Sequence, residues 1–336
     1  MEKERKVYMR KIKWGVLGTA GIAKGQTIPG MKEAANCELY AIAGRNIEKA
    51  KLFQEEFGFE KASGSYEELI QDENVEAIYI PLPNTMHYEW TVKALEAKKH
   101  VLCEKPLAPS EEIAQKMIET ANKNGVLLME AFAYLHSPFT KAVKEEIVNK
   151  TIGDVVYMES TFITSDYDLS NIRVRRDTLG GCMYDLGCYN TSQILWMLEE
   201  EPERIMAISD FSNQGIDSYT SAIMNFKSGK RAALNCGMVL QKEVDGRFDR
   251  IDNFRIHGTR GFIKSEVQFN QAGKLEYVIN VEGKEEVKVV DTPQNYKLEV
   301  EQLGRCILEG EKPHVSNEFT LMNARVLDWI LKEIQY

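Results

Sequence analysis

The sequence predicts an α/β protein of two domains, and three features of the chain lead to this prediction. Its 336 residues exceed what one typical hydrophobic core holds. Up to about residue 125, apolar runs alternate with segments of helical period, which is typical of a mostly parallel, doubly wound sheet. Beyond that point, strand-like runs follow one another with few helices between them, which indicates a large, open, mainly antiparallel sheet. We therefore expect a charged tail over residues 1–10, a nucleotide-binding domain over 11–126 and a second α/β domain over 127–336.

Helix boundaries are well marked in the first domain. Asn46, Ser65 and Ser110 are N-cap residues by type and position, and Gly58 and Gly125 stand where helices would end. The strands expected around these helices span residues 12–17, 38–43, 75–80 and 100–103.

The second domain is expected to be richer in strands, with its helices on one face of the sheet. It starts with the apolar run 126–130 and a helix from Pro138. Further helices are predicted over residues 183–198, 296–308 and 318–334. Strands are predicted over residues 155–163, 204–209, 221–226, 231–237, 254–257, 262–266, 275–281 and 286–290, with turn signals that include 245–246.

Composition excludes several classes of protein. A net charge of −9 gives no basic footprint for nucleic acid or for an anionic membrane surface. No apolar run approaches the ~20 residues of a membrane-spanning helix, and the charged N-terminus lacks the apolar segment of a secretory signal. The six cysteines show no metal-ligand or disulfide spacing. We therefore expect a cytoplasmic protein without a metal, a membrane or a nucleic-acid partner.

The turn after the first strand has the composition of a phosphate-binding loop. Its pattern is similar to G-x-G-x-x-G/A, with alanine at the second glycine position. Small residues here let the backbone approach a pyrophosphate at a helix N-terminus. The residues expected to bind a dinucleotide are Gly18, Thr19, Ala20, Gly21 and Ile22.

The segment at the end of the second strand indicates which dinucleotide is bound. NAD-dependent enzymes usually carry an acidic residue at this position, whereas Arg45 can hold the 2′-phosphate of NADP(H). NADP(H) is therefore favoured. NAD(H) remains an alternative because one arginine does not exclude the smaller cofactor. The structural alternative is that Arg45 is a solvated residue before the helix that Asn46 caps.

Two further strand ends are expected to face the cofactor crevice. After the strand 75–80 come Pro81, Leu82, Asn84 and His87, with His87 expected near the nicotinamide ribose. The structural alternative is that Asn84 is an N-cap and His87 a helix residue behind it.

The strand 100–103 ends in Glu104-Lys105-Pro106. A lysine there can donate to a substrate oxygen, and Glu104 can hold the lysine or a ribose. Taken alone, a surface lysine before a proline turn would be the commoner interpretation.

The order of these segments, followed by the stretch from Asp185 to Tyr189, resembles the glucose–fructose oxidoreductase/inositol dehydrogenase family (Gfo/Idh/MocA). The resemblance extends from about Ile12 to the last helix. It implies a Rossmann domain followed by an α/β domain whose open sheet is commonly a dimer interface. We therefore expect a homodimer that forms through the C-terminal sheet.

The resemblance also implies roles for single residues. Lys105 matches the active-site lysine of the family, and Asp185 and Tyr189 match its D-x-G-x-[HY] motif. Tyrosine at the last position is similar to the branch with dimeric dihydrodiol dehydrogenases and NADP-dependent xylose dehydrogenases. Asn171 and Arg173 resemble the substrate-side loop of that branch. Tyr134 is also expected to bind substrate, but its segment lacks an arginine that relatives often carry, so the substrate stays open.

These features predict an NADP-dependent oxidoreductase with Tyr189 as general acid/base. A tyrosine has an unperturbed pKa of about 10, and a cation ~4 Å away supplies up to roughly 4 kcal/mol at an effective dielectric near 20. Lys105 is therefore expected to lower the pKa of Tyr189, and Asp185, on the same helix face, to orient the substrate or the lysine. Without the other motifs, Asp185 would be interpreted as a helix cap and Tyr189 as a core aromatic.

The predicted reaction is hydride transfer between nicotinamide and a hydroxyl or carbonyl carbon of a sugar, polyol or trans-dihydrodiol. The alternative is a cofactor-sensing regulator that keeps the fold and catalyses nothing.

Overall fold

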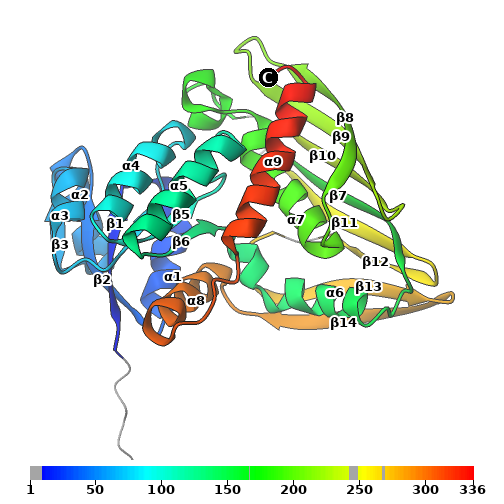
Figure 1. Ribbon diagram of the computed structural model, residues 1–336, viewed down its shortest axis with the longest axis horizontal. Helices are drawn as coiled ribbons and strands as arrows, with labels where there is room; N and C mark the ends of the chain where they lie inside the picture. Colours follow the sequence, from blue (N-terminus) through cyan, green and yellow to red (C-terminus); the bar gives the residue numbers. More distant parts are fainter. Residues whose placement is uncertain (1–9, 166, 242–248, 267–268) are drawn as a thin grey trace, which may run out of the picture.

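The computed structural model describes residues 10–165, 167–241, 249–266 and 269–336, which form two domains (Figure 1). The predicted charged tail, except for Arg10, and the turn predicted at 245–246 lie outside the described residues. Within these ranges, the structure contains no helix with the length and hydropathy of a membrane span.

The first domain contains a six-stranded parallel sheet of order β3-β2-β1-β4-β5-β6. Its strands are β1 (Ile12–Leu17), β2 (Cys37–Ala43), β3 (Lys61–Ser63), β4 (Ala77–Ile80), β5 (His100–Glu104) and β6 (Leu128–Ala131). The helices are α1 (Ile28–Glu33), α2 (Ile47–Phe57), α3 (Tyr66–Gln71), α4 (Asn84–Glu96) and α5 (Glu111–Asn124). Strand order reverses between β1 and β4, so the crevice that binds ligands in such sheets lies at the carboxyl ends of these two strands. The predicted parallel α/β domain is confirmed.

Local chemistry explains the boundaries of the helices in this domain. The side chains of Asn46, Ser65 and Ser110 each accept a hydrogen bond from the third residue of the helix that follows. Gly58 and Gly125 end their helices with φ of 83° and 67°, where glycine is favoured. The apolar run expected to open the second domain is β6, which pairs with β5, so the division near residue 126 falls just before the last strand of the first sheet.

The helix after β1 has an irregular turn. Residues Ala23–Thr27 form a π-helical turn, in which Ile28 N–H donates to the Ala23 carbonyl, and α1 continues from it. Pro29 has no N–H for the regular hydrogen bond, which gives this wider turn a physical cause. Such turns are frequent at functional sites.

The second domain contains an eight-stranded sheet of order β14-β13-β12-β11-β7-β10-β9-β8, in which the β7–β10 pair is parallel and the other pairs are antiparallel. The predicted mainly antiparallel sheet is confirmed. Its strands are β7 (Val155–Ser165), β8 (Pro202–Phe211), β9 (Asp217–Phe226), β10 (Arg231–Leu240), β11 (Arg250–Gly258), β12 (Gly261–Ser265), β13 (Gly273–Val281) and β14 (Lys284–Thr292). Helices α6 (Pro138–Val148), α7 (Cys188–Leu198) and α9 (Asn317–Glu333) contact one face of this sheet (Figure 1).

The two last helices return to the first domain. Helix α8 (Asn295–Glu309) packs on α1, and α9 packs on α5. Gly30 permits the first contact, because a β-carbon there would lie 2.7 Å from the backbone nitrogen of Lys297. This close approach brings Tyr296, at the start of α8, to the crevice of the first domain.

Candidate functional site

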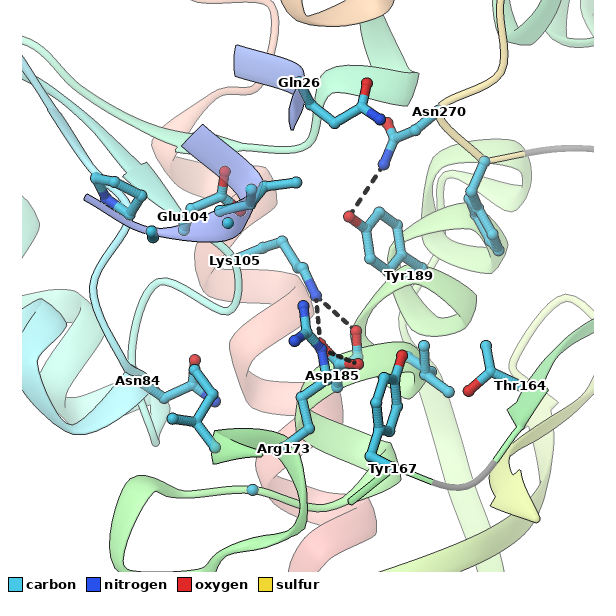
Figure 2. Close-up of a pocket in the computed structure, with 18 of the residues that line it drawn as sticks. Gln26, Asn84, Glu104, Lys105, Thr164, Tyr167, Arg173, Asp185, Tyr189 and Asn270 are labelled. Atoms are coloured by element: carbon cyan, nitrogen blue, oxygen red, sulfur yellow. Dashed lines mark hydrogen bonds and ion pairs between the residues drawn. The ribbon is translucent and has the colours of Figure 1, made fainter. Parts of the chain in front are cut away.

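A cavity of about 620 Å³ lies between the two domains, at the carboxyl ends of β1, β4 and β5. The first domain contributes the glycine turn and the residues after β4 and β5. The second domain contributes α7, the strands β7 and β11, and the loops beside them (Figure 2). The site therefore exists only where the domains meet.

The glycine turn has the geometry of a phosphate-binding loop. Gly18 has φ of 119°, and a β-carbon there would lie 2.9 Å from the Leu82 side chain. Gly21, where the helix begins, has no neighbouring atom within 4 Å of a β-carbon position, so the space before its backbone is open. Ala20, Gly21 and Ile22 line the cavity, while Thr19 lines an adjoining hollow. Exposed N–H groups at a helix start and open space fit a pyrophosphate.

Arg45 is exposed beside this turn. It interacts with the Tyr66 hydroxyl, which lies 3.7 Å from the β-carbon position of Gly18. Lys49, a residue that the sequence analysis did not single out, lines the adjoining hollow with Thr19. It lies in the first turn of α2, which follows Arg45 directly in the chain, so a second cation this close to Arg45 could have indicated it. Two cations thus flank the loop where a 2′-phosphate would bind.

The residues after β4 divide between the cavity and the interior. Pro81, Leu82 and Asn84 line the cavity. Asn84 is the first helical residue, not the N-cap, and its amide donates to the Leu179 carbonyl at 2.8 Å, which joins the domains. His87 differs from the expectation. It is fully buried away from the cavity lining, with its ring nitrogens 2.8 and 2.9 Å from the carbonyls of Leu82 and Pro106, and burial lowers its pKa.

Glu104 and Lys105 both face the cavity at the end of β5. The buried Tyr79 hydroxyl donates to Glu104 at 2.5 Å, and burial raises the pKa of Glu104. The Lys105 Nζ donates to the Asp185 carbonyl at 2.6 Å and lies 3.2 Å from its carboxylate. The Asp185 carboxylate also accepts from Arg173 Nε at 3.0 Å. One carboxylate therefore holds two cations that reach it from different domains.

The charges of this trio are well defined. Burial works to lower the pKa of Lys105, but Asp185, Cys188 and Glu104 together outweigh it, and the pKa is raised above its usual value. Burial likewise works to raise the pKa of Asp185, but Arg173 and Lys105 outweigh it and the pKa is lowered. Lys105 is therefore a cation and Asp185 an anion near neutral pH.

Tyr189 lines the cavity beside this trio, but the expected effect of Lys105 on it is not found. The Lys105 ammonium lies 4.6 Å from the centre of the Tyr189 ring, over its face, and makes no hydrogen bond to its hydroxyl. Burial, together with the charge of Glu104, raises the pKa of Tyr189 well above its usual value. The phenol is therefore protonated and uncharged near neutral pH, not an activated base.

The predicted substrate residues are placed differently from one another. Arg173 lines the cavity. Tyr134 lies behind the wall, fully buried, where its hydroxyl bonds to Ser192 at 2.8 Å. The Asn171 side chain accepts from Arg173 N–H at 3.0 Å and so shapes the loop without lining the cavity. Neither Tyr134 nor Asn171 is therefore placed to touch a substrate directly.

Several lining residues escaped the sequence analysis. Arg250, at the start of β11, places its guanidinium 4.6 Å from the centre of the Phe162 ring and pairs with Asp252. The predicted strand 254–257 begins too late to include it. Other cavity residues without a sequence signal are Gln26, Thr164, Phe269, Asn270 and Tyr296.

Comparisons with known proteins agree with this architecture. The profile of the GFO/IDH/MocA oxidoreductase family, NAD-binding Rossmann fold, matches residues 12–132, and that of the GFO/IDH/MocA C-terminal domain matches residues 140–264. A D-xylose 1-dehydrogenase (NADP(+)) from Haloferax volcanii is 33% identical over 96% of this chain and 97% of its own. A trans-1,2-dihydrobenzene-1,2-diol dehydrogenase from Xenopus tropicalis is 29% identical over 96% of this chain and 98% of its own. The crystal structure of a 3-ketoreductase from Actinomadura kijaniata with NADP and TDP-benzene has a TM-score of 0.90 and 27% identity, and the match covers 97% of this chain and 98% of that one.

Proposed function

The chain belongs to the Gfo/Idh/MocA family of oxidoreductases, and from this premise we propose that it transfers a hydride between NADP(H) and a hydroxyl or carbonyl carbon of a sugar, polyol or trans-dihydrodiol. One observation carries the proposal. Lys105 of the first domain and Asp185 and Tyr189 of the second converge on one cavity that also reaches the glycine turn. A cofactor bound at the turn would thus share one space with the Lys105 cation and the Tyr189 hydroxyl.

The proposed cofactor is NADP(H). Gly18 and the open space at Gly21 suit its pyrophosphate, and Arg45 with Lys49 suits its 2′-phosphate. The xylose dehydrogenase and the ketoreductase carry NADP in their names or structures, which supports the same preference here. When bound, the nicotinamide supplies or accepts the hydride.

We assign the proton and the charge to different side chains. Tyr189, held neutral by burial, donates a proton to the carbonyl oxygen in reduction and takes it back in oxidation. Lys105 stays charged and stabilises the oxyanion that develops there. Asp185 fixes the lysine, and Arg173 balances that carboxylate. Variants of the Actinomadura reductase have a lysine or a tyrosine replaced, and these two positions have the same spacing as Lys105 and Tyr189.

The chemistry of the cavity supports a polyhydroxylated substrate. Tyr167, Arg173 and Asn270 offer polar groups, and Phe162 and Phe269 offer flat apolar faces. Sugars present both hydroxyl groups and C–H faces, which matches this mixture.

Substrate class and cofactor are tested by the change in NADPH absorbance. D-Xylose, myo-inositol and trans-1,2-dihydrobenzene-1,2-diol are offered with NADP⁺, with NAD⁺ as the cofactor control, to wild type and to Tyr189→Phe. We expect turnover of one class with NADP⁺ and a large loss of kcat in Tyr189→Phe. Near-normal turnover in this variant would refute the role of Tyr189 and leave Lys105 as the proton donor. Tight NADPH binding without turnover of any substrate would favour the cofactor-sensing regulator.

A homodimer that forms through the second sheet completes the proposal. The sheet face opposite the helices exposes apolar side chains, which a dimer interface would remove from water. They belong to both edges of the sheet and to its centre, and include Met206, Ile208, Ile223, Val239, Ile251, Val287 and Val289. Light scattering tests this directly, with Ile208→Lys expected to yield monomers, because Ile208 is 76% exposed and a charge there would be buried only in the dimer interface. A cytoplasmic location is also proposed, and the six buried unpaired cysteines are consistent with it.

A further inference from the structure

Asn270 combines an unusual backbone with a contact to the proposed proton donor. Its φ is 51°, in the left-handed region that residues other than glycine rarely adopt. Its side chain lines the cavity, and its Nδ2 donates to the Tyr189 hydroxyl at 3.1 Å (Figure 2). Asparagine is among the residues that tolerate this backbone best, and such conformations persist where the surrounding structure holds them.

The neighbouring residue holds Asn270 in place. Phe269 is buried, and its ring centre lies 5.0 Å from that of Tyr189 and 4.9 Å from that of Tyr134. Its backbone N–H donates to Asp252 at 3.4 Å, and its carbonyl accepts from Arg250 at 3.2 Å. Phe269 thus fixes the backbone of Asn270 next to the Tyr189 ring. The Asn270 amide contacts the hydroxyl of that same ring.

This hydrogen bond decides where the Tyr189 proton points. Because Asn270 donates to the phenol oxygen, the hydroxyl's own hydrogen must point elsewhere. Within the described residues, no acceptor is found for it, and Tyr189 borders the cavity, so the hydrogen faces the space for substrate. Lys105 cannot orient the Tyr189 hydroxyl in place of Asn270, because its ammonium lies over the Tyr189 ring and not beside the phenol oxygen.

The same bond stabilises the product of proton transfer. In reduction, the carbonyl carbon gains the hydride and its oxygen gains the Tyr189 proton, which leaves a phenolate. The Asn270 N–H then becomes a hydrogen bond to a charged oxygen, which is stronger than one to a neutral hydroxyl. In oxidation the same phenolate accepts the proton of the substrate hydroxyl.

Resting on the proposed function of Tyr189, we propose that Asn270 is a positioning residue that aims the Tyr189 proton at the substrate and stabilises the phenolate left behind. The contribution of Asn270 should disappear when the Tyr189 hydroxyl is absent. A residue that only supports the fold would not show this dependence.

Two substitutions distinguish the effect of the Asn270 side-chain amide from that of its left-handed backbone. Asn270→Gly keeps the left-handed conformation and removes the donor. Asn270→Asp keeps the shape and places an acceptor where the donor stood. Both are combined with Tyr189→Phe in double-mutant cycles, with kcat measured in both directions on the best substrate of the panel above. NADPH affinity by fluorescence and the thermal midpoint are recorded for each variant.

We expect kcat to fall about 10- to 100-fold in Asn270→Gly and in Asn270→Asp, as for loss of a hydrogen bond to a charged group. NADPH affinity should stay within about threefold of wild type. The pH limb that Tyr189→Phe abolishes should move to higher pH, because a phenolate without its donor is less stable. In the Tyr189→Phe background, replacing Asn270 should cost no further activity.

The outcomes separate this inference from the proposed function. If Tyr189→Phe is impaired while both Asn270 variants turn over like wild type, the role of Asn270 is refuted and that of Tyr189 stands. The same follows if the fold-losses in kcat of the Asn270 and Tyr189 variants multiply in the double variants, because the amide would then act independently of the Tyr189 hydroxyl. It also follows if Asn270→Asp alone keeps full activity, because the side chain would then act as an acceptor. If Tyr189→Phe is near normal, the roles of both Tyr189 and Asn270 are refuted, while hydride transfer itself is not.

Discussion

Replacing Lys105 with methionine removes the cation of the site while keeping most of its volume. The side chain of Lys105 is 11% exposed, so its charge acts in a partly dry environment. At an effective dielectric near 20, a cation about 4 Å from a developing oxyanion contributes up to roughly 4 kcal/mol. The Asp185 carboxylate, 3.2 Å from the same ammonium, offsets part of the electrostatic stabilisation that Lys105 can give the oxyanion. We therefore expect the loss of one preorganised donor, about 100- to 1,000-fold in kcat.

The assay compares kcat, KM and NADPH affinity of wild type and Lys105→Met on the best panel substrate. Because the interaction forms in the transition state, kcat should fall much more than KM rises. Lys93→Met is the matched control. Lys93 also lies over an aromatic ring, 4.1 Å from the centre of the Trp90 ring, and pairs with Glu89 at 2.7 Å, but on the surface. A kcat for Lys105→Met within about threefold of the control would refute the electrostatic role of Lys105.

Three further predictions concern the cofactor site and stability. Gly18→Ala should weaken NADPH binding at least tenfold and cost about 1–3 kcal/mol of unfolding free energy, because its φ of 119° and the Leu82 side chain oppose a β-carbon; unchanged fluorescence titrations would contradict this. Arg45→Ala should raise KM for NADP⁺ about tenfold and leave KM for NAD⁺ unchanged. An equal change in KM for both cofactors would show that Arg45 does not bind the 2′-phosphate. Burial raises the pKa of Glu130 from 4.5 to about 7, so the folded state binds the extra proton and stability should fall as pH rises from 4.5 to 7. Glu130→Gln should flatten this dependence in denaturant titrations, and identical pH curves would exclude Glu130 as its source.

Local chemistry was sufficient to predict the alternating strands and helices of the first domain. The helix caps at Asn46, Ser65 and Ser110 depend on hydrogen bonds within one turn. The eight strands of the second domain were also predicted, because alternation and turn residues are local signals. The strand Lys61–Ser63 was not predicted, since three residues carry too little periodicity.

Side-chain direction at the site was not predictable in the same way. The motifs led to Lys105, Asp185 and Tyr189, which the structure brings to one cavity. They led equally to His87 and Tyr134, which packing turns into the interior. A motif gives the position of a residue along the chain, but which side of an element faces the cavity depends on the elements packed against it.

The sequence alone determined the fold class, the glycine turn and the strand ends that border the cavity, because these follow from periodicity and from backbone preferences within a few residues. Only the tertiary structure revealed that Arg250 and Asn270 reach the same cavity and that Lys105 faces the Tyr189 ring instead of its hydroxyl. These contacts join segments far apart in the chain, so they arise from the packing of the domains. No local pattern records such packing, because its energy comes from burial shared among all the contacting elements.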